Sequence, residues 1–125
     1  MVTILLVGIL GGLGAVSRYL LDRNIQGHTD SFFPFGTFAV NMLGATALGV
    51  IDGLGAIKSL PGVYVAVLGV GFVGGFTTFS TLMYESFSLL TTRGQRTFGV
   101  LNLLATVVLG IALYSIAFSF TKTFG

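Results

Sequence analysis

Hydrophobic residues run through this chain in four long stretches that are separated by short polar segments. Each stretch is close to the ~20 residues that an α-helix needs to cross the ~30 Å hydrocarbon core of a bilayer. The four stretches are Val2–Leu21, Gly36–Leu54, Gly62–Met83 and Phe98–Phe120. The pattern predicts an all-α membrane protein with four transmembrane helices, and an even number of crossings places both termini on the same side of the membrane.

The third stretch contains a segment that does not suit an uninterrupted membrane helix. Residues Gly71–Thr81 read Gly-Phe-Val-Gly-Gly-Phe-Thr-Thr-Phe-Ser-Thr, so that the adjacent Gly74 and Gly75 lead into hydroxyl and aromatic residues. Backbone that loses its helical hydrogen bonds at membrane depth is tolerated where it is buried in protein or lines a wet cavity. We therefore expect helix three to break near the midplane, with glycines supplying backbone conformations that other residues avoid.

Such a break would present groups that can hold ions. Two half-helices expose unpaired carbonyls from the first and unpaired N–H groups from the second. Carbonyls from Gly74 to Thr77 suit a hard cation such as Na⁺, while the positive edge of the Phe79 ring suits a small anion. The alternative is a kink without an ion, in which nearby hydroxyls satisfy the backbone: Thr77, Thr78, Ser80 and Thr81.

Polar side chains inside the second and fourth stretches either cross-link helices or contact an ion. Asn41 lies in the second stretch, with Thr37 one turn away on the same helix face. Its amide either cross-links two helices, a contact worth ~0.6 kcal/mol on average in membranes, or donates an N–H to an anion without the cost of a full charge. Asn102 and Thr106 in the fourth stretch pose the same choice, and there we favour the cross-link.

The composition agrees with one membrane domain over residues 1–125. Hydrophobic residues make up 54% of the chain and charged residues 8%, with a mean hydropathy of +0.97, which excludes an ordinary soluble domain. No basic residue precedes the first stretch, so we expect it to be retained as helix one and not cleaved as a signal. The absence of cysteine excludes disulfides and thiolate metal sites, and the single His28 falls in a loop.

Basic residues are nearly balanced between the two predicted sides of the membrane. The side of the termini carries Lys58 and Lys122. The other side carries Arg18, Arg23, Arg93 and Arg96. Because the asymmetry of Lys and Arg in short loops sets orientation, this weak bias leaves open both a single orientation and insertion in two orientations.

The small size of the chain favours assembly. Four helices leave little room for a water-filled path, so we expect a conduit to need a second subunit. Small residues at four-residue spacing let helix backbones approach closely in lipid. These are Gly8 with Gly12, Gly11 with Ala15, Ala45 with Gly49 and Gly53, and Gly71 with Gly75.

Three motifs, in order along nearly the whole chain, resemble the Fluc (CrcB) fluoride channels. They are Gly11–Tyr19, Gly36–Gly44 and Gly71–Thr81. The resemblance implies an antiparallel, dual-topology homodimer in a bacterial-type cytoplasmic (inner) membrane, with a structural Na⁺ at the dimer interface. It implies passive, highly selective export of cytoplasmic fluoride and protection against fluoride toxicity. The implied partners are fluoride, a second copy of the chain and the bilayer, with no nucleic acid.

The resemblance also implies roles for individual residues. Backbone carbonyls of Gly74 and Thr77 are expected to hold the Na⁺. The fluoride path is expected to include Phe79, Asn41, Thr37, Ser80 and Thr81, with Arg18 and Glu85 at the pore mouth or anchoring helix ends. This chain has Leu82 where many members have a second phenylalanine, so we expect Phe79 to carry the ring contact alone and conduction to survive.

Two other classes of protein fit parts of the pattern. A small proton-coupled multidrug or cation exporter also has four helices, but it needs a membrane-embedded acid, and Asp22 and Asp52 lie at predicted helix ends. A non-transporting scaffold protein would leave the hydroxyls of Thr77–Thr81 without a role. An enzyme is not expected, because no nucleophile and base fall within reach of each other.

Overall fold

The computed structural model describes residues 1–125, and all of its regular elements are helical. The elements are α1 (Val2–Gln26), α2 (Phe35–Ala56), α3 (Gly62–Val65), the π-helical segment η1 (Ala66–Val73), α4 (Gly74–Phe76), α5 (Ser80–Leu90) and α6 (Arg96–Phe124). Four spans are long and apolar enough to cross a membrane, the third being Gly62–Leu90, which combines α3, η1, α4 and α5. The predicted all-helical architecture with four membrane-spanning helices is confirmed.

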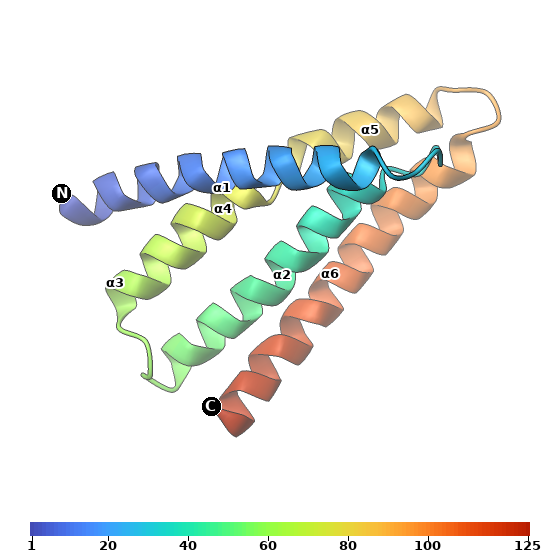
Figure 1. Ribbon diagram of the computed structural model, residues 1–125. Coiled ribbons are helices and arrows are strands. Elements are labelled where there is room, and N and C mark those ends of the chain that lie inside the picture. Colours follow the sequence, from blue (N-terminus) through green and yellow to red (C-terminus); the bar gives the residue numbers. More distant parts are fainter.

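The helices pack in pairs and do not form a closed bundle. Helix α2 runs alongside α6, α1 packs on η1 and α4, and α5 packs on α6 (Figure 1). The connection from α1 to α2 and the connection from α5 to α6 lie together at one end of the molecule (Figure 1). Both termini and the connection from α2 to α3 lie toward the other end, where the helices spread apart.

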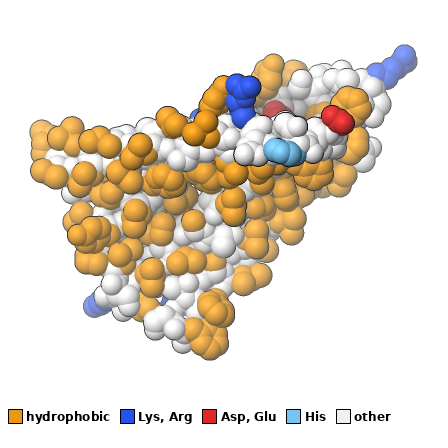
Figure 2. Space-filling view, viewed as in Figure 1, with side chains coloured by type: hydrophobic (Ala, Val, Ile, Leu, Met, Phe, Trp, Pro, Cys, Tyr) orange, Lys and Arg blue, Asp and Glu red, His pale blue; other side chains and the backbone are white.

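Little of the chain is buried within a single copy. Only 22 of 125 residues are buried, so most large hydrophobic side chains face outward. Hydrophobic side chains cover much of the face shown in Figure 2, and the charged groups visible there lie toward the ends. An apolar surface of this extent needs lipid or another protein surface around it.

Close packing of α1 on the third span depends on glycines. A Cβ atom on Gly75 would lie 2.1 Å from the carbonyl oxygen of Gly11, so only glycine permits this approach. Gly74 has φ −60° and ψ −39°, which is ordinary right-handed helix. The expectation that Gly74 and Gly75 supply unusual backbone conformations is therefore wrong. Glycine is required at Gly75 by the close approach of Gly11, whereas a Cβ atom on Gly74 would have only the carbonyl oxygen of Gly69 nearby, at 3.8 Å. The one glycine with positive φ is Gly94, in the connection from α5 to α6.

Glycines also bring α2 against α6. A Cβ atom on Gly49 would lie 2.5 Å from the carbonyl oxygen of Tyr114, and one on Gly53 would lie 2.8 Å from Cβ of Thr121. By contrast, nothing lies within 4 Å of a Cβ atom placed on Gly8 or Gly12. The small-residue spacing of α2 thus packs helices within one copy, while the Gly8 and Gly12 positions of α1 remain open.

Candidate functional site

The third span leaves the helical conformation between α4 and α5. Thr77 has φ −82° and ψ 159°, an extended conformation, and α5 begins at Ser80 with Phe79 as its N-cap residue. The backbone N–H of Thr77 donates to the carbonyl oxygen of Val73 (2.9 Å), and the Thr77 hydroxyl donates to the same oxygen (3.0 Å). The residues outside the helix are therefore Thr77–Phe79, which follow the paired glycines.

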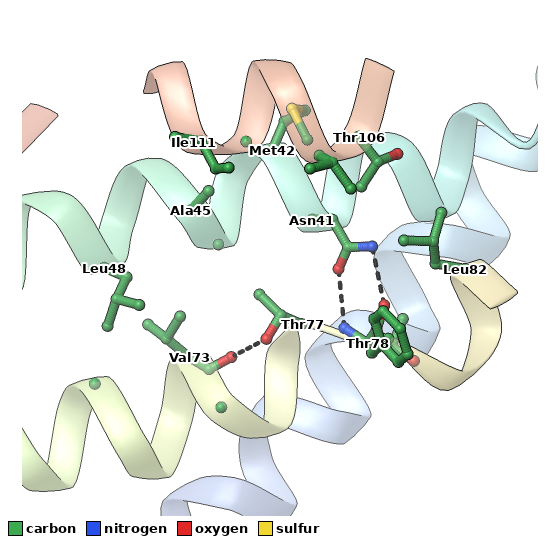
Figure 3. A pocket seen from close by; sticks show the side chains of 16 residues that line it. Asn41, Met42, Ala45, Leu48, Val73, Thr77, Thr78, Leu82, Thr106 and Ile111 are labelled. Atoms are coloured by element: carbon green, nitrogen blue, oxygen red, sulfur yellow. Dashed lines mark hydrogen bonds between the residues drawn. The ribbon is translucent and has the colours of Figure 1, made fainter. Parts of the chain in front are cut away.

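Asn41 of α2 holds the non-helical backbone in place. Its Nδ2 donates to the carbonyl oxygen of Thr78 (3.0 Å), and its Oδ1 accepts from the backbone N–H of Thr78 (2.9 Å) (Figure 3). Both backbone polar groups of one residue, its N–H and its carbonyl, are thereby satisfied outside a helix. Because an amide NH₂ carries two donors, one N–H of Asn41 is left over for another acceptor.

The Thr78 hydroxyl organises the start of α5. Its oxygen accepts from the backbone N–H of Thr81 (3.1 Å), as an N-capping side chain does. The same hydroxyl donates to Oγ1 of Thr81 (3.1 Å) and lies 3.3 Å from Oγ of Ser80. The hydroxyl cluster found in the sequence therefore caps a half-helix in this structure.

Thr37 and Glu85 link α2 to α5 at a separate point. The Thr37 side chain is 2% exposed, and its hydroxyl donates to Oε1 of Glu85 (2.5 Å). A hydroxyl has a single hydrogen, so this donor is already committed to the carboxylate. Thr37 can donate to an anion only after it releases Glu85.

A groove of about 450 Å³, here called the central groove, lies between α2, α6 and the end of α4. Its lining includes polar or backbone-exposing positions from three spans, several of them labelled in Figure 3. These are Asn41, Gly74, Thr77, Thr78, Phe79 and Thr106. The rest of the lining is largely apolar, as in a site that fixes a small ligand with few polar contacts.

Phe79 and Leu82 differ sharply in their surroundings. Phe79 is 72% exposed and lines the central groove, so its ring is not used for packing within one copy. Leu82 lines the same groove but is only 4% exposed. Phe79 is thus the ring that remains available to a ligand or to a second copy.

Gly74 and Thr77 both line the central groove. Helix α4 ends at Phe76, and the last carbonyls of a helix lack partners from within that helix. No group of three or more His, Cys, Asp and Glu side chains is placed to hold a metal ion. A cation in this groove would therefore be bound by backbone oxygens, the kind of ligand that Na⁺ takes at broken membrane helices.

The structure divides the predicted site residues into groups. Asn41, Gly74, Thr77 and Phe79 meet in the central groove. Four others do not line that groove: Thr37 and Glu85 pair with each other, while Ser80 and Thr81 start α5 beside Thr78. Arg18 lies on α1, away from that groove, and its buried Nε has no hydrogen-bond partner.

Two groove residues were missed among the predicted site residues. Thr78 matters through its peptide group, which the sequence signals only by its place in the hydroxyl run. Thr106 lines the groove, and its buried hydroxyl has no partner. Its neighbour one turn away, Asn102, donates from Nδ2 to Oγ of Ser86 (2.8 Å), which is the cross-link expected for it.

These features define a four-span helical membrane protein with a largely apolar groove, containing a few polar groups, at an interruption of its third span. The family model described as "CrcB-like protein, Camphor Resistance (CrcB)" matches residues 5–118, and the chain belongs to this family. The resemblance noted in the sequence is confirmed.

Individual relatives agree with this assignment. A protein named fluoride-specific ion channel FluC 2 from Clostridium acetobutylicum is 40% identical over 85% of this chain and 86% of its own length. The protein named fluoride-specific ion channel FluC from Geobacter sulfurreducens is 42% identical over 87% of this chain and 88% of its own. FluC 1 from Leifsonia xyli is 44% identical over 74% of this chain and 68% of its own.

Proposed function

We propose that this chain is a fluoride-specific ion channel that lets cytoplasmic fluoride leave the cell passively and so protects against fluoride toxicity. The relatives are named fluoride-specific ion channels, which supports fluoride as the transported ion and gives no support to a proton-coupled exporter. The observation that carries the proposal is the central groove, where Asn41 and the exposed Phe79 ring flank non-helical backbone. A passive channel makes and breaks no covalent bond, which fits the absence of a nucleophile and base from the sequence pattern.

The side chains suit the chemistry of a small, strongly hydrated anion. Fluoride that sheds water needs donors, and Asn41 has one N–H beyond the bond to Thr78. The positive edge of the Phe79 ring attracts the ion, while its apolar bulk excludes water. Contacts outside the central groove are proposed for the other residues that the resemblance implies. They are Thr37, once it releases Glu85, with Ser80 and Thr81, and Arg18 and Glu85 at the mouth.

The channel is proposed to be an antiparallel homodimer in the inner membrane. The central groove is open along one side of a single copy, so a second copy is required to enclose a path. The near balance of basic residues between the two sides supports insertion in two orientations. Two-fold symmetry about an axis in the membrane plane would bring the two interrupted spans together near the midplane.

A structural Na⁺ is proposed at the centre of this dimer. Gly74 and Thr77 of both copies would supply its backbone oxygens, which fits a groove without clustered acidic side chains. The cation would neutralise the carbonyl ends of the two α4 segments where they face each other. Its role is to hold the interface, and fluoride passes elsewhere in the groove.

Efflux from liposomes tests the proposal. Purified protein is reconstituted with internal fluoride or chloride, an ionophore balances charge, and ion-selective electrodes follow each anion. Fast loss of fluoride with chloride retained is the expected result. Equal loss of the two anions would contradict the assigned selectivity, and uptake of a lipophilic cation driven by a proton gradient, without anion loss, would favour the exporter.

A further inference from the structure

A second cavity lies at the C-terminal end of α2, beside the connection to α3. It has a volume of about 840 Å³ and is formed by the end of α2, the start of the third span and the connection between them. We call it the headgroup cavity. It shares two lining residues with the central groove, Leu48 and Gly69, and is a separate cavity. Its walls are otherwise mostly small or apolar, and two charged side chains line it, Asp52 and Lys58.

Asp52 is an acidic residue near the C-terminal end of α2, where the partial negative charge of the helix end disfavours a carboxylate. It precedes Ala56, the last residue of α2, by four positions, which is ~6 Å along the axis. The carbonyl end of a helix is electronegative, so a carboxylate there favours a nearby cation. The Tyr114 hydroxyl donates to Oδ2 of Asp52 (2.6 Å), which fixes the carboxylate but leaves its charge uncompensated.

Lys58 enters the same cavity from a strained backbone. Its φ of 60° makes it the one residue other than glycine with positive φ in the chain. Its N–H donates to the carbonyl oxygen of Gly55 (3.1 Å), and the N–H of Ser59 donates to that of Leu54 (3.0 Å), which closes the end of α2. Glycine would fill such a position without strain, so a lysine kept there points to a use for its side chain.

We propose that the headgroup cavity binds a zwitterionic phospholipid with a primary amine, the chemistry of phosphatidylethanolamine. The ammonium group donates to Asp52, and the phosphodiester accepts from Lys58. One acyl chain follows the apolar wall past Val65 and Val70 toward Leu48. The charges are complementary in number and sign, and Asp52 and Lys58 lie at the end of α2, one of the four spans long enough to cross a membrane.

The headgroup amine and its N–H donors distinguish phosphatidylethanolamine from the other common lipid classes. Phosphatidylcholine has the same net charge, but its quaternary amine has no N–H to donate to Asp52. Phosphatidylglycerol lacks the amine, so its phosphate would accept from Lys58 but its headgroup would offer no cationic donor to Asp52. Charge-assisted hydrogen bonds are the strong ones, so loss of this contact should weaken binding about tenfold.

Lipid quenching of a single tryptophan tests the assignment, because the chain has no Trp of its own. The reporter is Leu60→Trp, at the edge of the headgroup cavity. Full-length protein is reconstituted in phosphatidylglycerol vesicles that contain brominated phosphatidylethanolamine or brominated phosphatidylcholine at equal fractions. We expect half-maximal quenching at about a tenfold lower fraction of the ethanolamine lipid. Equal quenching by the two lipids would overturn the proposal.

Variants on the reporter background assign the contacts. Asp52→Asn keeps an acceptor for Tyr114 but removes the charge, and it should abolish the preference between the two lipids. Lys58→Gln should weaken both lipids alike, because both carry the phosphate. Lys122→Gln is the matched control, since this lysine lies over the Phe118 ring (5.3 Å) and does not line the cavity.

Two further outcomes count against the proposal. Quenching by neither lipid would mean that a second copy covers the cavity. An unchanged lipid preference in Asp52→Asn would show that the carboxylate does not determine which headgroup is bound. The readout is lipid contact and not ion flux, so the result is independent of the proposed fluoride channel.

Discussion

Asn41 and Thr78 pair through two hydrogen bonds, of 2.9 and 3.0 Å, in which one amide side chain bonds both the backbone N–H and the carbonyl of a single residue. The pairing shows that cross-linking and ion contact are compatible roles for Asn41. Its Oδ1 and one N–H hold the backbone of the third span, and the second N–H stays available in the central groove. A single residue thus supports both the shape of the proposed path and its chemistry.

Asn41→Asp should abolish fluoride flux. The carboxylate cannot donate to the Thr78 carbonyl, and its charge repels an anion in the groove. A combined penalty of about 3 kcal/mol corresponds to a loss of about 100-fold in rate. Initial efflux rates from fluoride-loaded liposomes measure this effect. Asn24→Asp, an exposed site near the end of α1, is the control for added charge and should conduct normally.

Phe79→Leu should lower fluoride flux by at least about tenfold, because an aliphatic side chain lacks the positive ring edge. The folded state should be almost unaffected, since the ring is 72% exposed within one copy. Phe87→Leu is the matched control, in the same span and 67% exposed. Similar fluoride flux in Phe79→Leu and Phe87→Leu would show that the Phe79 ring does not contact fluoride along the path.

The sequence predicts the number and approximate position of the membrane spans well, but it predicts their end points poorly. The four spans follow directly from the length of each apolar run, which the bilayer fixes. Their ends do not: α1 continues from the predicted Leu21 to Gln26, because a helix can extend into the polar interface.

The interior of the site depends on tertiary contact and was predicted less completely. Gly75 was correctly singled out, but glycine is required there by the approach of α1, which no local pattern reveals. Likewise, Asn41 was recognised as an amide in need of a partner, whereas the identity of Thr78 as that partner depends on the register between two spans.

Leu82 should be compatible with conduction as it stands. Leu82→Phe places a larger side chain at a position that is 4% exposed, and overpacking of this kind costs about 1–3 kcal/mol. We expect no gain in fluoride flux and a lower melting temperature in detergent. An inactive parent protein that Leu82→Phe restores to activity would show instead that two rings are required.

Gly75→Ala should destabilise the fold by about 1–3 kcal/mol or more, because its Cβ would lie 2.1 Å from the carbonyl oxygen of Gly11. Gly8→Ala is the matched control on α1. Nothing lies within 4 Å of a Cβ at that position, so the gain in helix propensity of about 0.5–1 kcal/mol should dominate. Unfolding of both variants by denaturing detergent, followed by circular dichroism, measures the two opposite shifts.

Replacement of Na⁺ by K⁺ should lower the stability of the dimer. A ligand that binds only the assembled state stabilises it by about 2.7 kcal/mol at 100 times its dissociation constant, so removing the ion that fits Gly74 and Thr77 removes that contribution. The melting temperature of the purified dimer, measured at constant ionic strength in Na⁺ and in K⁺, reports the loss. Choline chloride separates a specific site from a general salt effect, since choline is too large for a cage of backbone oxygens and should behave like K⁺. A dimer that is equally stable in all three salts would contradict the proposed Na⁺ site. Helix packing alone would then stabilise the interface.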